Sequence, residues 1–171
     1  MKKTVLLLAS LFVMTLATQG VMAQNSADAT ANATATIITP ISIKKTADLL
    51  FGKIVKSDDG GTVVIDTEGN AVYSGVTEFA NNINVSAAQF TVKGNAGNTY
   101  SILLPTSITI SETGGATMTV DNFTSSPDET AGGIIASNGT QTLSVGATLN
   151  VGADQTPGEY TGSFDVTVSY N

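Results

Sequence analysis

The stretch GEYTGSFDVTVSYN, residues 158–171, decides the fold class of this chain because apolar and polar side chains alternate along it. A period of two is typical of a β-strand with one buried face. Gly162 interrupts the apolar face, as expected of a bulge or a close backbone approach. We therefore predict that residues 160–170 form the longest strand, either sealed between neighbours or at an edge that recruits another strand. The apolar face consists of Tyr160, Phe164, Val166, Val168 and Tyr170.

The same alternation recurs near the start of the chain and predicts another half-buried strand. Its small apolar face comprises Ala29, Ala31, Ala33, Ala35 and Ile37. Further short strands are predicted at residues 50–55, 62–66, 88–93, 100–104, 107–111, 117–123, 141–145 and 148–151, with Gly94–Asn98 as a hairpin connection. No segment combines helix caps with an apolar stripe of helical period. The sequence thus predicts an all-β fold, a single immunoglobulin-like β-sandwich of about eight to ten short strands.

Residues 1–23 have the features of a signal peptide. Lys2 and Lys3 precede an apolar run over residues 5–17, and Val21-Met22-Ala23 resembles a cleavage site. The run is shorter than the roughly 20 residues that span a membrane, so we expect cleavage and export rather than a membrane anchor. The predicted organisation is a signal peptide at 1–23, an N-terminal extension or first strand at 24–38, and a β-sandwich domain at 39–171. We expect the mature protein in the periplasm, at the cell surface or outside the cell.

The composition excludes several classes of function. With no histidine and no cysteine, the chain cannot form Ser-His-Asp or Cys-His catalytic arrangements or zinc sites with nitrogen or sulfur ligands. Without Lys2 and Lys3, five lysines face fourteen carboxylates, a net charge of −9 with no arginine. Such a surface repels phosphate backbones, so we expect no nucleic acid partner. These observations favour a non-catalytic protein without a cofactor.

Two acidic turns are the weak candidates for metal binding. Asp58 and Asp59 lie in one, and Asp66 and Glu68 in the other. They supply the oxygen ligands that calcium takes, but neither turn follows the twelve-residue loop pattern with a terminal Glu. Because Asp is common in turns for local hydrogen bonding, solvated turns explain these residues more simply.

The C-terminal stretch resembles the last strand of pilus subunits assembled by the chaperone–usher route. Those subunits end in alternating apolar residues, with a penultimate Tyr, here Tyr170, and a Gly fourteen places from the end, here Gly158. An ordinary closing strand would show the same alternation. Many such subunits carry a disulfide, which this chain cannot form because it has no cysteine.

A broader resemblance covers nearly the whole mature chain. The segments that carry it are residues 33–43, 50–55, 90–95, 100–102, 149–153 and 157–162. They resemble a bacterial secreted family catalogued as domain of unknown function 4402, which is similar in outline to fimbrial and spore-coat-U-type domains. The resemblance implies a secreted, pilin-like sandwich with a role in surface appendages, and it implies no catalytic residues.

Two functions remain open from the sequence. In the first, the chain is a structural subunit that polymerises by strand exchange, with residues 29–37 as the donated strand and residues 164–170 beside the accepting groove. Its partners would be like subunits or a periplasmic chaperone. In the second, a self-complete secreted sandwich binds glycan or a surface protein through its loops, which agrees with the many strands predicted after Leu50. The small alanine side chains weigh against the first function, because donated strands usually carry larger residues.

Overall fold

A computed structural model describes residues 26–80 and 84–171, so the predicted signal peptide, residues 1–23, lies outside the described residues. The chain divides into two units, residues 1–36 and residues 37–171. In the described part of the first unit, residues 26–36, every residue is exposed and in no helix or strand. The predicted half-buried strand at residues 29–37 is therefore wrong for the single chain, where this segment finds no pairing partner.

The all-β prediction is confirmed, since the described residues contain strands and no helix. The described residues therefore contain no helix that is long and apolar enough to cross a membrane. The strands are β1 (Ser42–Ala47), β2 (Leu50–Phe51), β3 (Ile54–Val55), β4 (Gly61–Ile65), β5 (Ala71–Ser74), β6 (Thr77–Glu78), β7 (Val85–Ser86), β8 (Ala88–Lys93), β9 (Thr99–Leu103), β10 (Ser107–Ser111), β11 (Thr117–Ser126), β12 (Gly133–Ile134), β13 (Thr140–Val151) and β14 (Thr167–Tyr170).

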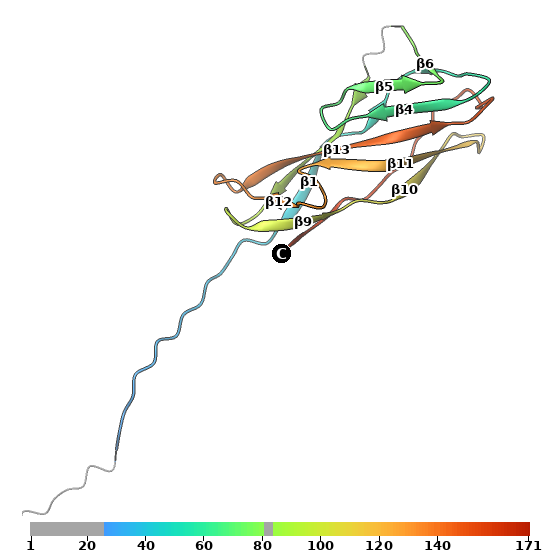
Figure 1. Ribbon diagram of the computed structural model, residues 1–171. Coiled ribbons are helices and arrows are strands. Elements are labelled where there is room, and N and C mark those ends of the chain that lie inside the picture. The colour runs from blue at the N-terminus through green and yellow to red at the C-terminus, as the bar shows by residue number, and fades with distance from the viewer. Residues whose placement is uncertain (1–25, 81–83) are drawn as a thin grey trace, which may run out of the picture. The chain divides into compact units, whose positions relative to one another are not determined.

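All strand pairs are antiparallel, and they form one large sheet with smaller ones around it (Figure 1). The seven-stranded sheet has the order β1-β8-β13-β11-β10, and β4 and β5 extend it from the far half of β13. A three-stranded sheet has the order β12-β9-β14. β2-β7 and β3-β6 form two further two-stranded sheets. β13 is long enough to pair with β8 in its first half and with β4 in its second.

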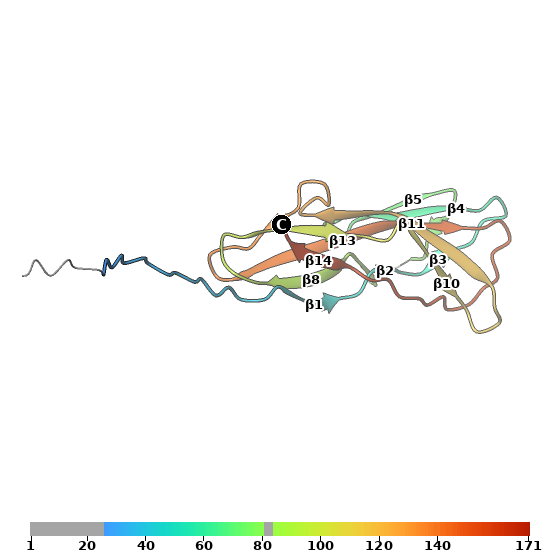
Figure 2. The same ribbon diagram turned by 90° about the horizontal axis from the view of Figure 1, so that it is seen from below.

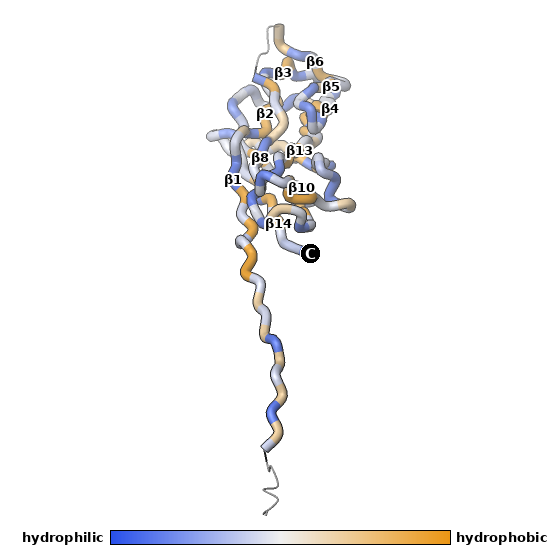
Figure 3. The backbone as a smooth tube through the Cα atoms, turned by 90° about the vertical axis from the view of Figure 1, so that its left-hand side faces the viewer, coloured by the Kyte–Doolittle hydropathy of each residue, from blue (hydrophilic) through white to orange (hydrophobic). Residues whose placement is uncertain are grey.

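Two apolar clusters form the core. One contains Val92, Leu143 and Val145 of the large sheet together with Tyr100 and Ile102 of β9, so the three-stranded sheet packs on the large one here. The other lies under the far half of β13, around Val63, Ile65, Val120 and Leu149. Apolar stretches at β10 and beside β13 are visible in Figure 3. In the described part of the chain, no other extended sheet covers the second cluster. A site can therefore form here.

Three connections differ from the prediction. The segment Gly94–Asn98 is not a hairpin turn, because β8 and β9 belong to different sheets and pack face to face through Val92 and Tyr100. The predicted strand at residues 50–55 is divided into β2 and β3 at Gly52, whose φ of 74° takes the chain out of extended geometry. The predicted strands at residues 141–145 and 148–151 are one strand, β13.

The C-terminal stretch is only partly a strand. β14 covers Thr167–Tyr170 and pairs with β9, while Thr161 makes an isolated bridge to Ser111 of β10. Residues 162–166 have no strand partner within the described residues, so the prediction that residues 160–170 form the longest strand is wrong. The alternation itself holds, since Phe164, Val166, Val168 and Tyr170 are half-buried and the residues between them are exposed. This segment crosses from the edge of the large sheet to the edge of the small one.

Candidate functional site

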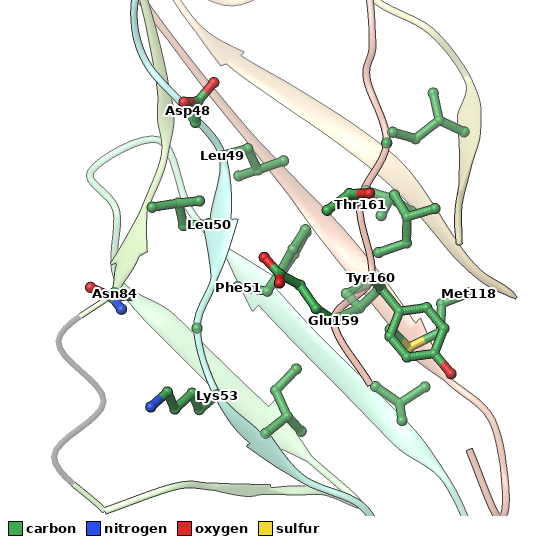
Figure 4. A pocket seen from close by; sticks show the side chains of 18 of the residues that line it. Asp48, Leu49, Leu50, Phe51, Lys53, Asn84, Met118, Glu159, Tyr160 and Thr161 are labelled. Atoms are coloured by element: carbon green, nitrogen blue, oxygen red, sulfur yellow. The ribbon is translucent and has the colours of Figure 1, made fainter. Parts of the chain in front are cut away.

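A groove of about 1020 Å³ runs between two segments that are far apart in the sequence. We call residues 48–56, which contain β2 and β3, the first wall, and residues 155–164 the second wall. Figure 4 shows Leu49, Leu50 and Phe51 on one side and Glu159, Tyr160 and Thr161 on the other. The two walls run in opposite directions. At one end of the groove, Lys45 and Phe164 both lie near Phe90. At the other end, Lys56 forms an ion pair with Asp154.

The floor of the groove is the second core cluster itself. It consists of side chains from β10, β11 and β13 that point between the walls: Ile108, Ile110, Met118, Val120, Leu149 and Val151. Phe51 and Ile54 of the first wall and Tyr160 of the second wall pack against the same cluster. Ile110, Val120, Leu149 and Val151 are at most 9% exposed, so an extended segment laid along this groove would contact mainly the half-buried Ile108 and Met118.

Both walls contain backbone that has no second strand partner among the described residues. Within the described residues, β1 pairs with β8 alone, β2 with β7 alone and β3 with β6 alone, so each keeps one free edge. On the opposite side, Thr161 is held to Ser111 by two backbone hydrogen bonds of 3.0 and 2.9 Å, after which residues 162–166 run without a partner. Free N–H and C=O groups on an edge are the template to which another strand adds.

Gly162 allows the second wall to approach the floor. A Cβ atom at this position would lie 2.7 Å from Cγ2 of Ile110 and 3.1 Å from the carbonyl oxygen of Thr109. The close backbone approach expected from the sequence is thus present, although the bulge is not, since no strand runs through residues 162–166. The glycine lets the chain cross over β10 before it joins β9.

Gln155 holds the second wall in place. Its side-chain Nε2 donates to the carbonyl oxygen of Thr117, at 3.1 Å, and to the hydroxyl of Tyr160, at 2.7 Å. Its Oε1 accepts from the N–H of Gly152, at 3.2 Å, and the Tyr160 hydroxyl donates to the carbonyl oxygen of Thr156, at 2.7 Å. The wall is therefore preorganised, which lowers the entropic cost of binding.

Different interactions lie beyond the two ends of the groove. Beyond Lys45 and Phe164, β1 and β14 lie next to each other, and the Tyr170 hydroxyl donates to the carbonyl oxygen of Thr39 at 2.8 Å. Figure 2 shows β14 and β1 from below. At the other end, Nζ of Lys56 lies 3.6 Å from Oδ1 of Asp154, and both side chains are largely exposed.

The structure separates the predicted assembly residues into two groups. Gly158, Tyr160 and Phe164 line the groove. Val166, Val168 and Tyr170 pack on the first core cluster, where they anchor the end of the second wall. Phe164 joins the two regions, since its ring contacts those of Phe90 and Phe123 at centroid distances of 6.4 and 5.1 Å.

The candidate donor residues all lie outside the strands of the chain. Ala29, Ala31, Ala33, Ala35 and Ile37 are exposed, and Ile37 is 96% exposed.

The calcium candidates are not brought together as a metal site. Within the described residues, no three acidic side chains are grouped so that they could hold a metal ion. Asp66 closes its own turn: Oδ1 accepts from the N–H groups of Glu68 and Asn70, and Oδ2 accepts from the Asn70 amide. These bonds, the Asn70 side-chain bond above all, hold the pKa of Asp66 below its ordinary value. Asp58 and Asp59 lie in the exposed turn before β4.

Sequence reasoning missed the first wall and the floor as parts of one site. Leu49, Phe51, Ile110 and Met118 come from separate segments that only the tertiary structure brings together. Gln155 gave no signal either, because a single glutamine in a loop has no pattern. The apolar alternation around Phe164 was the one local signal that pointed to this place.

A comparison with protein families matches residues 41–170 to the family described as "Domain of unknown function (DUF4402)". No curated protein and no solved structure matches the chain. The matched residues begin just before β1 and end with β14, so they include both walls and the floor of the groove. The resemblance expected from the sequence is confirmed, and the chain belongs to the DUF4402 family.

Proposed function

We propose that this chain is a non-catalytic, exported structural subunit of a fimbria- or pilus-like surface assembly, and that it assembles by β-strand pairing in the groove. The observation that carries the proposal is the groove itself, which lies over an apolar cluster and whose first wall contains β2 and β3, each with one strand partner among the described residues. An added strand would gain main-chain hydrogen bonds from the edges and register from alternate side chains on the floor.

The same chain contains a segment of the chemistry that the groove needs. Residues 29–37 alternate small apolar side chains with Thr and Asn, contain no charge and no proline, and are exposed. Because the alanines are small, most of the apolar contact would come from Ile37 and from Ile38, which is 47% exposed. The partners of this chain would be like subunits or a periplasmic chaperone.

The proposal is tested by supplying the strand separately. Residues 24–171 and residues 39–171 are expressed, and the shorter protein is mixed with a peptide of residues 28–38. We expect the shorter protein to bind the peptide and to gain thermal stability and protease resistance from it. A matched peptide with Ala33→Asp and Ile37→Asp should have neither effect, because it would bury two carboxylates on an apolar floor.

The outcomes separate the two functions left open by the sequence. If both proteins are stable monomers and the peptide changes neither, strand pairing is wrong. Retention of either monomer on a glycan array would then support a self-complete binding module.

A further inference from the structure

The large sheet carries two lysines that no carboxylate neutralises. Lys44 of β1 and Lys93 of β8 are exposed, and neither ammonium group forms an ion pair or a hydrogen bond within the described residues. We propose that these lysines mark a binding surface for an acidic polysaccharide. The surface is separate from the groove, since neither lysine lines it.

The strand register brings the two lysines side by side. β1 and β8 are antiparallel, with Ser42 opposite Lys93 and Lys44 opposite Thr91, so the lysines are diagonal neighbours. Diagonal neighbours on one face of a sheet lie about 7–8 Å apart. One oxyanion can therefore contact both ammonium groups, or two oxyanions of one polymer can each contact one.

Hydroxyl side chains surround the two lysines on the same face. On β13, Thr140 lies opposite Lys93 and Thr142 lies opposite Thr91. Each hydroxyl both donates and accepts hydrogen bonds, as the hydroxyls of a sugar do. We call these six residues the basic patch: Ser42, Lys44, Thr91, Lys93, Thr140 and Thr142.

The basic patch lies on the face of the large sheet that is turned away from the three-stranded sheet. Ile43 and Val92 are opposite each other on β1 and β8, and both pack in the first core cluster. Because side chains alternate along a strand, Lys44 and Lys93 point to the other face. Figure 2 shows β1 and β8 side by side.

The carboxylates nearby in the strand register are too distant or turned away from the basic patch. Asp121 lies opposite Thr148, six residues along β13 from Thr142. At about 3.3 Å per residue, this separation is about 20 Å, more than twice the screening length of about 8 Å at physiological salt. Glu129 lies beyond the end of β11, and its Oε1 accepts from the N–H of Leu104, next to β9 of the small sheet.

The three other lysines of the domain have different surroundings. Lys45 pairs with Asp48, and Lys56 pairs with Asp154. The ammonium group of Lys53 lies over the ring of Phe79, 5.9 Å from its centroid. Like charges at neighbouring positions of a sheet are destabilising. The pair in the basic patch is therefore an unneutralised positive site, and its charge is complementary to an anionic ligand.

The chemistry of the basic patch favours a polysaccharide over nucleic acid. Lysine binds carboxylate, sulfate or phosphate as a point charge. Nucleic acid binding usually adds bases stacked on aromatic rings or read by arginine. The basic patch has no aromatic side chain, and the chain without residues 1–23 has no arginine. An acidic polysaccharide needs neither, because its oxyanions contact the lysines and its hydroxyls contact Ser and Thr.

Binding of soluble polysaccharides to residues 24–171 tests the proposal. Polygalacturonate offers carboxylates, dextran sulfate offers sulfates, and dextran is the uncharged control. Calorimetric titration at low and at physiological ionic strength measures the affinity of each. We expect at least one of the two acidic polymers to bind, more weakly as salt increases, and dextran not to bind. Absence of binding by both acidic polymers would overturn the proposal, and a difference between them shows which oxyanion is preferred.

Substitution of the two lysines tests the location of the surface. Lys44→Gln together with Lys93→Gln should weaken binding about five- to tenfold, because two exposed ion pairs are lost. Ser74→Glu together with Thr119→Glu is the matched control. It lowers the net charge equally, at exposed positions of the same face in the strand row of Asn150. At physiological salt the control should bind as wild type does, and equal affinities of the lysine variant and wild type would contradict the assignment.

Acetylation of the unmodified sequence gives a second readout. An N-hydroxysuccinimide ester of acetate is added with and without the bound polymer, and mass spectrometry measures each lysine. The polymer should protect Lys44 and Lys93 severalfold and leave Lys56 unchanged. Equal protection of all three lysines would overturn the basic patch as the site. Single-stranded DNA bound as tightly as the polysaccharides would overturn the polysaccharide as the ligand class.

Discussion

The hydroxyl of Tyr170 donates a hydrogen bond of 2.8 Å to the carbonyl oxygen of Thr39, across 131 positions of the chain. This bond ties the last strand to the point where the N-terminal extension leaves the domain. The penultimate tyrosine thus has a structural role that its position in the sequence does not reveal.

Replacing Tyr170 by Phe should destabilise the domain, whereas the same change at Tyr100 should not. The Tyr170 hydroxyl makes two hydrogen bonds with the backbone, so its loss should lower the free energy of unfolding by about 1–2 kcal/mol. The Tyr100 hydroxyl is buried and has no hydrogen-bond partner among the residues that the structure describes, so its loss should leave that free energy unchanged or raise it by up to about 1 kcal/mol. Urea unfolding of both variants measures the difference, and equal losses would contradict the assignment.

Alanine should be tolerated at Gly158 and not at Gly162. At Gly162 the new methyl group would meet the side chain of Ile110 at 2.7 Å, and overpacking of this kind costs about 1–3 kcal/mol. At Gly158 the nearest atoms belong to the flexible side chain of Glu112, at 3.4 Å, so the change should stay within about 0.5 kcal/mol. Chemical unfolding curves of the two variants decide this, and a Gly162→Ala protein as stable as wild type would show that the second wall can move away from β10.

The second wall should loosen when Gln155 is replaced by Ala. The change removes hydrogen bonds to Thr117, Gly152 and Tyr160, with an expected loss of about 1–2 kcal/mol in stability. Limited proteolysis should then cut within residues 152–163 faster than in wild type, and the 28–38 peptide should bind more weakly. Gln89→Ala, on the exposed face of β8, is the control and should change neither property. Unchanged proteolysis in the Gln155 variant would mean that the wall is held by other contacts.

Acid should weaken the turn at Asp66. The folded pKa of Asp66 lies below its ordinary value of 3.8, because the charged carboxylate accepts hydrogen bonds from Glu68 and Asn70. A lowered folded pKa means that the carboxylate contributes stability above pH 3.8, and that this contribution is lost as the pH falls through the folded pKa. Asp66→Asn should therefore be less stable than wild type at neutral pH, with the gap closing below pH 3.8. A gap that stays constant from pH 7 to pH 3 in denaturant unfolding would contradict this linkage.

The sequence by itself determined the all-β class and the faces of the strands, because both follow from a local period of two. The apolar side chains of residues 164–170 are half-buried and the residues between them are exposed, even at residues 164–166, where the backbone is not in a strand. The family could also be recognised from short segments of the sequence, and these segments overlap the matched residues 41–170.

Only the tertiary structure decided which strands become neighbours. Gly94–Asn98 has the composition of a hairpin turn, yet it joins two different sheets, and Val92 and Tyr100 on either side of it are both buried in the same core cluster. Residues 162–166 alternate as a strand does, yet they lie unpaired beside a groove, because a strand requires a partner's backbone as well as its own pattern. The groove and the Tyr170–Thr39 bond arise from contacts between distant segments, and no local pattern in the sequence encodes such contacts.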